Sequence, residues 1–217
     1  MNKVTKQLIP ISLLIIFTMI ISSCSNTEKT YWPNGNIKSE LPYKGDKLDG
    51  MARWYYEDGI IQQEVPYVED MIEGVLVRYH VNGRKEVEET YVNNIKNGKT
   101  VEYSYPGKRI DQKYYLNDTL HGTYRKWHGN GELQITGEFV HGLYEGNWLY
   151  YDDFGELIGE GKFTAGSGEQ RFWNPDGSLL SRTQYMNNLK HGKEIFYRPD
   201  GEVDYEVEYA FDEPVTE

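Results

Sequence analysis

The sequence is poor in three classes of residue. Only one of its 217 residues is a cysteine, which excludes an internal disulfide and any zinc site built from several cysteines. Apolar residues make up 38%, although aromatic residues reach 14% with 19 tyrosines; this excludes a thick aliphatic core and favours a thin, half-buried sheet. Basic residues number 23 against 34 acidic ones. Because binding to phosphates needs an excess of Lys and Arg, we expect no nucleic-acid partner.

The first 23 residues differ from the rest of the chain. Two lysines precede an apolar run from Leu8 to Ile21 that contains no acidic residue. This pattern predicts a secretory signal peptide over 1–23, because the run is shorter than the span of about 20 residues that crosses a membrane. Residues 21–24, Ile-Ser-Ser-Cys, resemble the lipobox of bacterial lipoproteins. The resemblance implies that Cys24 is acylated, palmitate included, and begins the mature chain; an ordinary signal with an incidental cysteine, or an uncleaved anchor, is the alternative.

The lipobox resemblance also implies a location in the cell envelope. Ser25, rather than Asp, follows Cys24, which favours the outer membrane over the inner one if the enterobacterial sorting rule applies. Removing 1–23 takes away two lysines and no acid, so the formal net charge goes from −11 to −13. An anionic bilayer does not attract such a chain. The membrane contact would come from the acyl chains, at about 0.8 kcal/mol per buried CH₂.

The rest of the sequence repeats one unit eight times. A turn glycine recurs every 24 residues, with one interval of 22, at Gly35, Gly59, Gly83, Gly107, Gly131, Gly155, Gly177 and Gly201. A second glycine lies nine residues before each, except in the first unit, at Gly50, Gly74, Gly98, Gly122, Gly146, Gly168 and Gly192. An aromatic residue stands four residues before each turn glycine and another eight after it, which accounts for 16 of the 31 aromatic residues. Such a fixed period indicates a repeat array.

Each unit reads as a β-hairpin, because two apolar runs flank a turn. Pro-Asp-Gly at 199–201 predicts a three-residue loop with Gly in the left-handed conformation. With that loop, Arg198 faces Glu202 and Tyr197 faces Val203. The sequence therefore predicts an all-β, elongated and twisted single-layer antiparallel meander of about eight hairpins and sixteen strands. The expected boundaries are 24–30 for a short tether, 31–209 for the repeat array and 210–217 for an acidic tail.

The segment GNWLYYDDFGELIGEGKF, residues 146–163, resembles a MORN repeat in the variant form common in bacteria. The resemblance extends over 26–209. It implies a platform for protein interactions or for contact with a membrane, and it supplies no catalytic motif. Bacterial proteins of this kind are often described as antitoxin-like or immunity-like.

Residues with catalytic chemistry do not form a recognisable constellation. His121 and His191 stand in the same place before a repeat glycine, as turn residues would. Neighbouring acids such as Asp152 and Asp153 point to opposite faces of a strand and cannot act together. We therefore expect no enzyme, no catalytic residue, no metal site and no cofactor.

A second face of the sheet is the candidate binding face. Its residues alternate with the two aromatic columns, which we expect on the inner face. The candidates are Trp32, Trp54, Tyr56, Tyr150, Phe172, Phe196 and Arg198. Exposed Trp, Tyr and Arg are common anchors of interfaces, although partial cover by neighbouring side chains, or capping of the array ends, would explain the same pattern.

Three functions follow as alternatives. The first is a membrane-anchored, non-enzymatic scaffold for protein–protein interaction at the cell envelope. The second is a module that binds glycan or peptidoglycan through stacked rings. The third, immunity toward a partner toxin, follows from the family resemblance alone.

Overall fold

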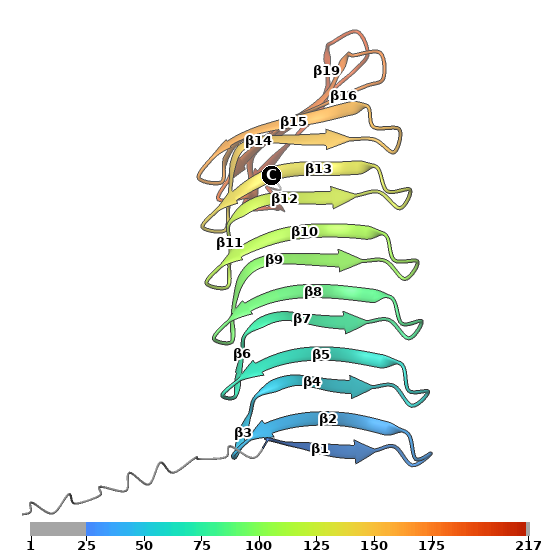
Figure 1. Ribbon diagram of the computed structural model, residues 1–217. Coiled ribbons are helices and arrows are strands. Elements are labelled where there is room, and N and C mark those ends of the chain that lie inside the picture. The colour runs from blue at the N-terminus through green and yellow to red at the C-terminus, as the bar shows by residue number, and fades with distance from the viewer. Residues whose placement is uncertain (1–24, 216–217) are drawn as a thin grey trace, which may run out of the picture.

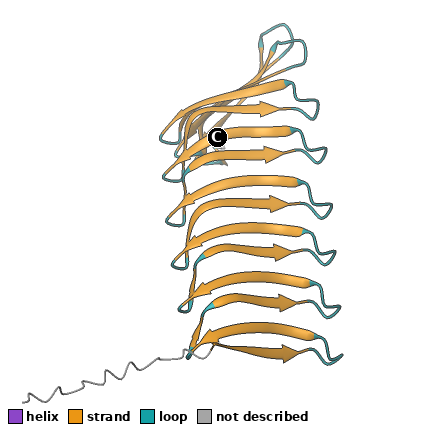
Figure 2. Ribbon diagram, viewed as in Figure 1, coloured by secondary structure: helices purple, strands orange, loops and turns teal. Residues whose placement is uncertain are grey.

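The computed structural model describes residues 25–215, which form one antiparallel sheet of twenty strands with no helix in that range (Figures 1 and 2). The strands are β1 (Ser25–Tyr31), β2 (Ile37–Lys44), β3 (Lys47–Leu48), β4 (Gly50–Tyr55), β5 (Ile61–Val68), β6 (Met71–Ile72), β7 (Gly74–Tyr79), β8 (Lys85–Val92), β9 (Ile95–Tyr103), β10 (Arg109–Leu116), β11 (Thr119–Leu120), β12 (Gly122–Trp127), β13 (Leu133–Val140), β14 (Leu143–Tyr151), β15 (Leu157–Thr164), β16 (Ser167–Trp173), β17 (Leu179–Met186), β18 (Leu189–Tyr197), β19 (Val203–Ala210) and β20 (Glu213–Pro214). Three pairs of consecutive strands each form one row of the sheet, because both members pair with the same preceding strand. These pairs are β3 with β4, β6 with β7 and β11 with β12. The eight hairpins therefore give sixteen rows, with β20 beyond them, and the predicted all-β meander is confirmed.

The array is longer at both ends than the sequence pattern indicated. Residues 25–31 form β1, paired with β2 from Ser25↔Lys44 to Tyr31↔Ile37, so the expectation of a tether over 24–30 is wrong for 25–30. All seven residues of β1 are exposed, so the pairing comes from the backbone and leaves no apolar pattern in the sequence. In the expected acidic tail, β20 pairs with Tyr209 and Ala210. The predicted signal peptide, Cys24 and residues 216–217 lie outside the described residues.

The predicted hairpin loop is confirmed in every unit. The amide of Arg198 donates to the carbonyl of Glu202 at 2.8 Å, and the amide of Gly201 donates to the carbonyl of Arg198 at 2.8 Å. Gly201 has φ +86°, a conformation that favours glycine. The same two backbone bonds close all eight loops.

A bulge after each loop decides which side chains share a face. Positions within a unit are counted from its turn glycine. In the last unit Tyr197 (−4) pairs with Val203 (+2), whereas Phe196 (−5) pairs with Tyr205 (+4), so Asp204 (+3) is an extra residue. The same shift occurs in all eight hairpins. One extra residue reverses the alternation of side chains. The aromatic at +8 therefore faces opposite to the aromatic at −4, and the expectation that both columns share one face is wrong.

The two faces differ in burial. We call the face with positions −4 and +5, which carries Tyr55, Tyr79 and Tyr103, the ladder face. The opposite face, with positions −7, −5, +4, +6 and +8, carries Tyr150 and Phe172 and is the groove face. Thirteen of the sixteen buried non-glycine residues lie on the groove face: Ser39, Ala52, Val65, Val87, Glu89, Thr100, Asp111, Trp148, Phe163, Gln170, Ser181, Thr183 and Glu194. The expectation that the face of Tyr197 and Val203 is the inner one is therefore wrong.

The single interval of 22 residues has a structural cause. In the regular connection between β8 and β9, Glu89 pairs with Thr100 but Tyr91 pairs with Lys96, so β9 carries two extra residues. Between β15 and β16 the pairing is continuous from Gly159 to Thr164. The two missing residues have thus removed this second bulge. The glycine nine residues before the turn glycine has a positive φ in the regular units but not at Gly168, where the bulge is absent.

The C-terminal half is curled and contains an aromatic cluster on the groove face. The strands stack as near-parallel rows up to β14, and the rows beyond turn away (Figure 1). Trp148 packs against Tyr124, Phe139 and Tyr144 with ring centroids 4.4–5.6 Å apart. Gly137 makes room for this cluster, because a Cβ there would lie 2.2 Å from the Trp148 ring.

Candidate functional site: a row of clefts beside the hairpin loops

The +3 bulge residues and the −5 residues line clefts between neighbouring hairpins. One cleft of about 450 Å³ lies between the third and fourth units, where Ile110 at +3 faces Arg78 and Glu102 at −5. Another of about 480 Å³ uses the equivalent positions between the fifth and sixth units. The clefts thus recur with the repeat and lie on the groove face beside the loops.

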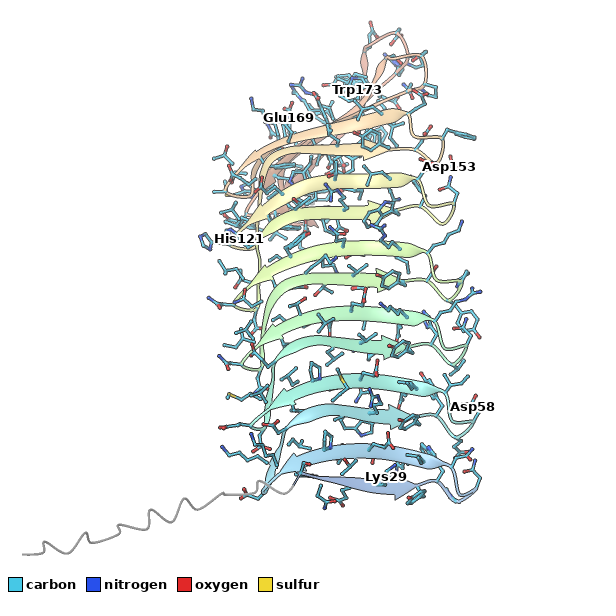
Figure 3. The ribbon with its side chains drawn as sticks, in the orientation of Figure 1. Lys29, Asp58, His121, Asp153, Glu169 and Trp173 are labelled. Atoms are coloured by element: carbon cyan, nitrogen blue, oxygen red, sulfur yellow. The ribbon has the colours of Figure 1, made fainter. Side chains whose placement is uncertain are left out.

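The second of these clefts is the most aromatic. Tyr150 and Phe172, both at position −5, have ring centroids 5.2 Å apart and an interplanar angle of 55°. Burial raises the pKa of the Tyr150 hydroxyl above its ordinary value. The remaining lining residues are His128, Gln134, Ile135, Tyr151, Asp152, Asp153 and Ile158. The cleft thus combines two tilted rings in contact and aliphatic walls with two carboxylates near the loop edge, where Asp153 is labelled in Figure 3.

A third cleft adjoins the aromatic one. It has a volume of about 560 Å³, and Asp152 and Ile158 line both. Trp173 and Pro175 supply its apolar wall, and Glu156 adds a further carboxylate. Asp152 also accepts hydrogen bonds from the amides of Phe154 and Glu156, which holds the carboxylate at the loop.

Hydrogen bonds join several neighbouring loops, but Asp152 beside the third cleft makes none of them. In four units the side chain at −3 bonds to the carbonyl of the −4 residue one unit on. These bonds join Trp32 to Tyr55, Tyr56 to Tyr79, His80 to Tyr103 and His128 to Tyr151, at 2.8–3.1 Å. Asp152 occupies the same position but has no proton to donate. The row of bonds is therefore interrupted where the third cleft lies.

The predicted site residues do not form one patch. Trp32 and Tyr56 use their polar groups to join neighbouring loops, and Trp54 pairs with Ser39 and Gln63 in the N-terminal part. The Phe196 ring stacks on Tyr205 at 4.5 Å, and Arg198 pairs with Glu202 in its own loop. Only Tyr150 and Phe172 meet in a cleft. Within 25–215, all of these except Arg198 are half-buried.

Sequence reasoning missed the residues around Tyr150 and Phe172. Ile158 is the bulge residue at +3, and Ile135, at +4 of the preceding unit, pairs with Tyr150. His128 reaches the cleft from the preceding loop. A signal existed, because apolar residues at +3 occur only from the fourth unit onward, at Ile110, Ile158 and Leu180. Only the bulge in the structure shows that a residue at +3 lines a cleft.

Neither a metal-binding cluster nor a membrane-spanning helix is found among residues 25–215. No group of three or more His, Cys, Asp or Glu side chains in this range is arranged to hold a metal ion. The same residues contain no helix long and apolar enough to cross a membrane.

Comparison with known families agrees with the hairpin geometry. The MORN repeat variant matches residues 26–44, 48–69, 120–141, 167–187 and 190–210. Each matched segment covers one hairpin, and the three unmatched hairpins have the same loop and the same bulge. A comparison with curated proteins finds no match. Five of the eight hairpins of this chain are therefore similar to the MORN repeat variant.

Proposed function

We propose that the protein is a membrane-anchored, non-enzymatic repeat scaffold that binds another protein at the bacterial cell envelope. The observation that carries this proposal is the aromatic cleft of about 480 Å³ where Tyr150 and Phe172 meet. Concave sites with aromatic anchors and a polar rim are typical of protein interfaces. MORN repeats generally mediate protein or membrane interactions, which supports the same reading.

The charge around the cleft indicates the chemistry of the partner. Asp152, Asp153 and Glu156 lie beside the rings, and the whole chain has a formal net charge of −11. A Lys or Arg side chain can stack on an aromatic ring while a carboxylate neutralises its charge. We therefore expect the partner to present basic side chains at this cleft.

The proposal is tested by capture of a partner from a detergent extract of the envelope with the full chain. Wild-type protein is expected to retain a specific partner, and Tyr150→Ala or Phe172→Ala to lose at least tenfold in affinity, since hot-spot aromatics are worth about 2 kcal/mol or more. Phe211→Ala is the matched control, because Phe211 is half exposed at the opposite edge of the sheet. A wild-type chain that retains nothing, or a partner bound equally by all variants, would contradict the proposal.

Glycan binding is the second candidate, and the same cleft favours it. Rings beside carboxylates and an amide, as at Phe172, Asp152 and Gln134, suit a sugar that stacks on the ring and donates hydroxyl hydrogen bonds to the carboxylate. Purified cell wall should then sediment the wild-type chain but not Phe172→Ala. If the wall does not retain the wild-type chain, this candidate is dropped.

The anchor is tested separately. Cys24→Ser is expected to move the protein from the membrane fraction to the soluble fraction, and globomycin should cause a precursor to accumulate. Unchanged processing in both experiments would exclude lipidation at Cys24 without affecting the cleft.

A further inference from the structure

The two ends of the sheet carry backbone groups that have no partner among residues 25–215. β1 pairs with β2 on one side only, and it lies at the bottom of the array, where Lys29 is labelled in Figure 3. At the other end β20 covers only Tyr209 and Ala210 of β19. Val203 and Tyr205, further along β19, remain 49% and 51% exposed. Such an edge is a template for adding a strand.

The two end strands, β20 and β1, correspond to the two parts of one interior row of the sheet. Inside the array, the two-residue strand β3 is followed by Asp49 and then by β4, and both pieces pair with β2. The amide of Asp49 donates to the carbonyl of Pro42, which lies seven residues after the turn glycine Gly35. β20 is the counterpart of β3, and Val215 makes the bond equivalent to that of Asp49, with the carbonyl of Glu208. β1 from Asn26 onward is the counterpart of β4, because Asn26 stands where Gly50 does.

The interior register predicts how β1 of one copy would lie on β19 of another. In the array, +4 pairs with the next unit's −5 and +5 with its −6, as in Ser39↔Trp54 and Glu40↔Arg53. Tyr205 would then face Thr30 of the added copy, and Glu206 would face Lys29. Acid and base therefore meet at the centre of the contact, which stabilises a cross-strand pair.

Interior rows are joined by polar contacts from a tyrosine and a basic residue to a glutamate. The first strand carries the tyrosine and the basic residue, and the last long strand carries the glutamate. The hydroxyl of Tyr55 donates to Glu40 of the preceding unit at 2.7 Å, and the charge of Arg53 acts on Glu40 as well. In the first unit the equivalent of Tyr55 is Tyr31, which is 59% exposed. In the last unit the equivalent of Glu40 is Glu206. Tyr31 and Lys29 of one copy would therefore lie next to Glu206 of another copy, as Tyr55 and Arg53 lie next to Glu40.

The geometry points to head-to-tail assembly, in which β1 of one copy adds to β19 of the next and continues the sheet. The partner is a second copy of this chain, so the contact is heterologous and repeats without closing, which gives open filaments. This assembly uses the ends of the sheet and is independent of the cleft in the proposed function.

Disulfide trapping tests the contact and its register. In the full chain with Cys24→Ser, Thr30→Cys and Tyr205→Cys would face each other across the contact, within reach of a disulfide, because facing residues of antiparallel strands lie about 5 Å apart. Oxidation is expected to give a ladder of dimers, trimers and larger species on a non-reducing gel. The register control, Thr30→Cys with Glu206→Cys, moves one residue and should give no ladder.

A charge exchange provides a second readout in case the cysteine variants fold poorly. Lys29→Glu and Glu206→Lys each place like charges at the contact, so each should weaken self-association about tenfold in sedimentation velocity. The double variant should restore it. Glu57→Lys, at an exposed loop position, is the control for the change of charge. A wild-type chain that stays monomeric up to about 200 μM, equal trapping in both registers, or dimers from Thr30→Cys alone would overturn the proposal.

Discussion

Three tyrosines of the ladder face join neighbouring units through glutamates. The hydrogen bonds run from Tyr55 to Glu40, Tyr79 to Glu64 and Tyr103 to Glu88, at 2.7, 2.8 and 2.6 Å. Burial, with the hydrogen bond added, raises the pKa of each of these tyrosines to about 12. The hydrogen bonds from Lys29 and Tyr55 lower the pKa of Glu40 below its ordinary value. The neutral phenol and the charged carboxylate are thus the forms that the fold stabilises.

This arrangement predicts a loss of stability at high pH. An unfolded tyrosine ionises near pH 10, and these three ionise in the folded protein at about 12. Their contribution is therefore complete below about pH 10 and is lost as the pH rises toward 12. Urea unfolding should give a free energy that is flat between about pH 6 and 9 and falls above 10.

The triple variant Tyr55→Phe, Tyr79→Phe, Tyr103→Phe tests the cause. At pH 7 it should lose about 1 kcal/mol per site, a typical value for a half-exposed hydrogen bond. Its decline above pH 10 should be smaller than that of the wild type. A decline of equal size would mean that other tyrosines carry the effect.

Two glycines of the same unit should differ in how much stability an added methyl group costs. At Gly137 a Cβ would lie 2.2 Å from the buried Trp148 ring, whereas at Gly129 nothing lies within 4 Å. Overpacking of a core costs about 1–3 kcal/mol. Gly137→Ala should therefore lower the free energy of unfolding by about that amount, and Gly129→Ala by less than about 0.5 kcal/mol. Denaturant titration followed by tryptophan fluorescence measures both, and equal effects would contradict the packing of Trp148.

At the scale of the strand connections, the shortened unit changes how the turns meet. The turn at Asn187–Asn188 has two positive φ angles, like the other turns between hairpins except the first, where Gly45 has a positive φ and Asp46 does not. Asn188 accepts a hydrogen bond from the amide of Tyr144 and donates one to the carbonyl of Gly142, both at 2.8 Å and two units back. Its counterpart Asn94 makes one side-chain bond, to the amide of Ile72 one unit back. Turns that lie two units apart are thus joined directly in this region.

Asn188→Ala should therefore cost more than Asn94→Ala. The two residues have φ of 68° and 67°, so the strain introduced by alanine is the same at both. The difference is one further hydrogen bond in a half-buried place, worth about 1 kcal/mol. Thermal unfolding of the two variants measures this difference. Equal losses would show that the bridge between Asn188 and Gly142 does not contribute to stability.

At the scale of the molecule, each hairpin rests on its neighbours in the chain. Contacts reaching two units away occur around Asn188, but the rows below β14 bond only to adjacent rows. Stability should then be close to a sum of hairpins and interfaces.

A deletion in phase with the repeat tests this additivity. Removing 50–73 joins Asp49 to Gly74 and takes out one full period of 24 residues. The shortened array should keep the same circular dichroism per residue and lose roughly one eighth of the unfolding free energy. Removing 50–72 instead shifts the pattern by one residue and turns side chains to the wrong face, so that variant should unfold or aggregate. Equal behaviour of the two deletions would contradict the repeat register.

The fold could be predicted from the sequence because its information is local. The Pro-Asp-Gly and Asn-Asn turns set two loop types, and the positions of Gly201 and Tyr197 fixed the pairing across the loop, as the structure confirms. The site could be predicted only in part. Tyr150 and Phe172 were recognised as candidates, but their cleft also contains Ile158. The place of Ile158 depends on a β-bulge, and no particular residue type marks that bulge in the sequence.

The sequence alone determined the repeat, the all-β class, the hairpin loops and the order of the strands, because turn chemistry and spacing act over a few residues. Only the tertiary structure decided which face is buried, since one extra residue at +3 reverses every side chain that follows it. The tertiary structure also decided that Tyr150 and Phe172 meet while Trp32, Trp54 and Phe196 do not. The reason is the strand pairing, which places Gly159 between Tyr150 and Phe172 in neighbouring rows, where the absence of a side chain lets the two rings meet.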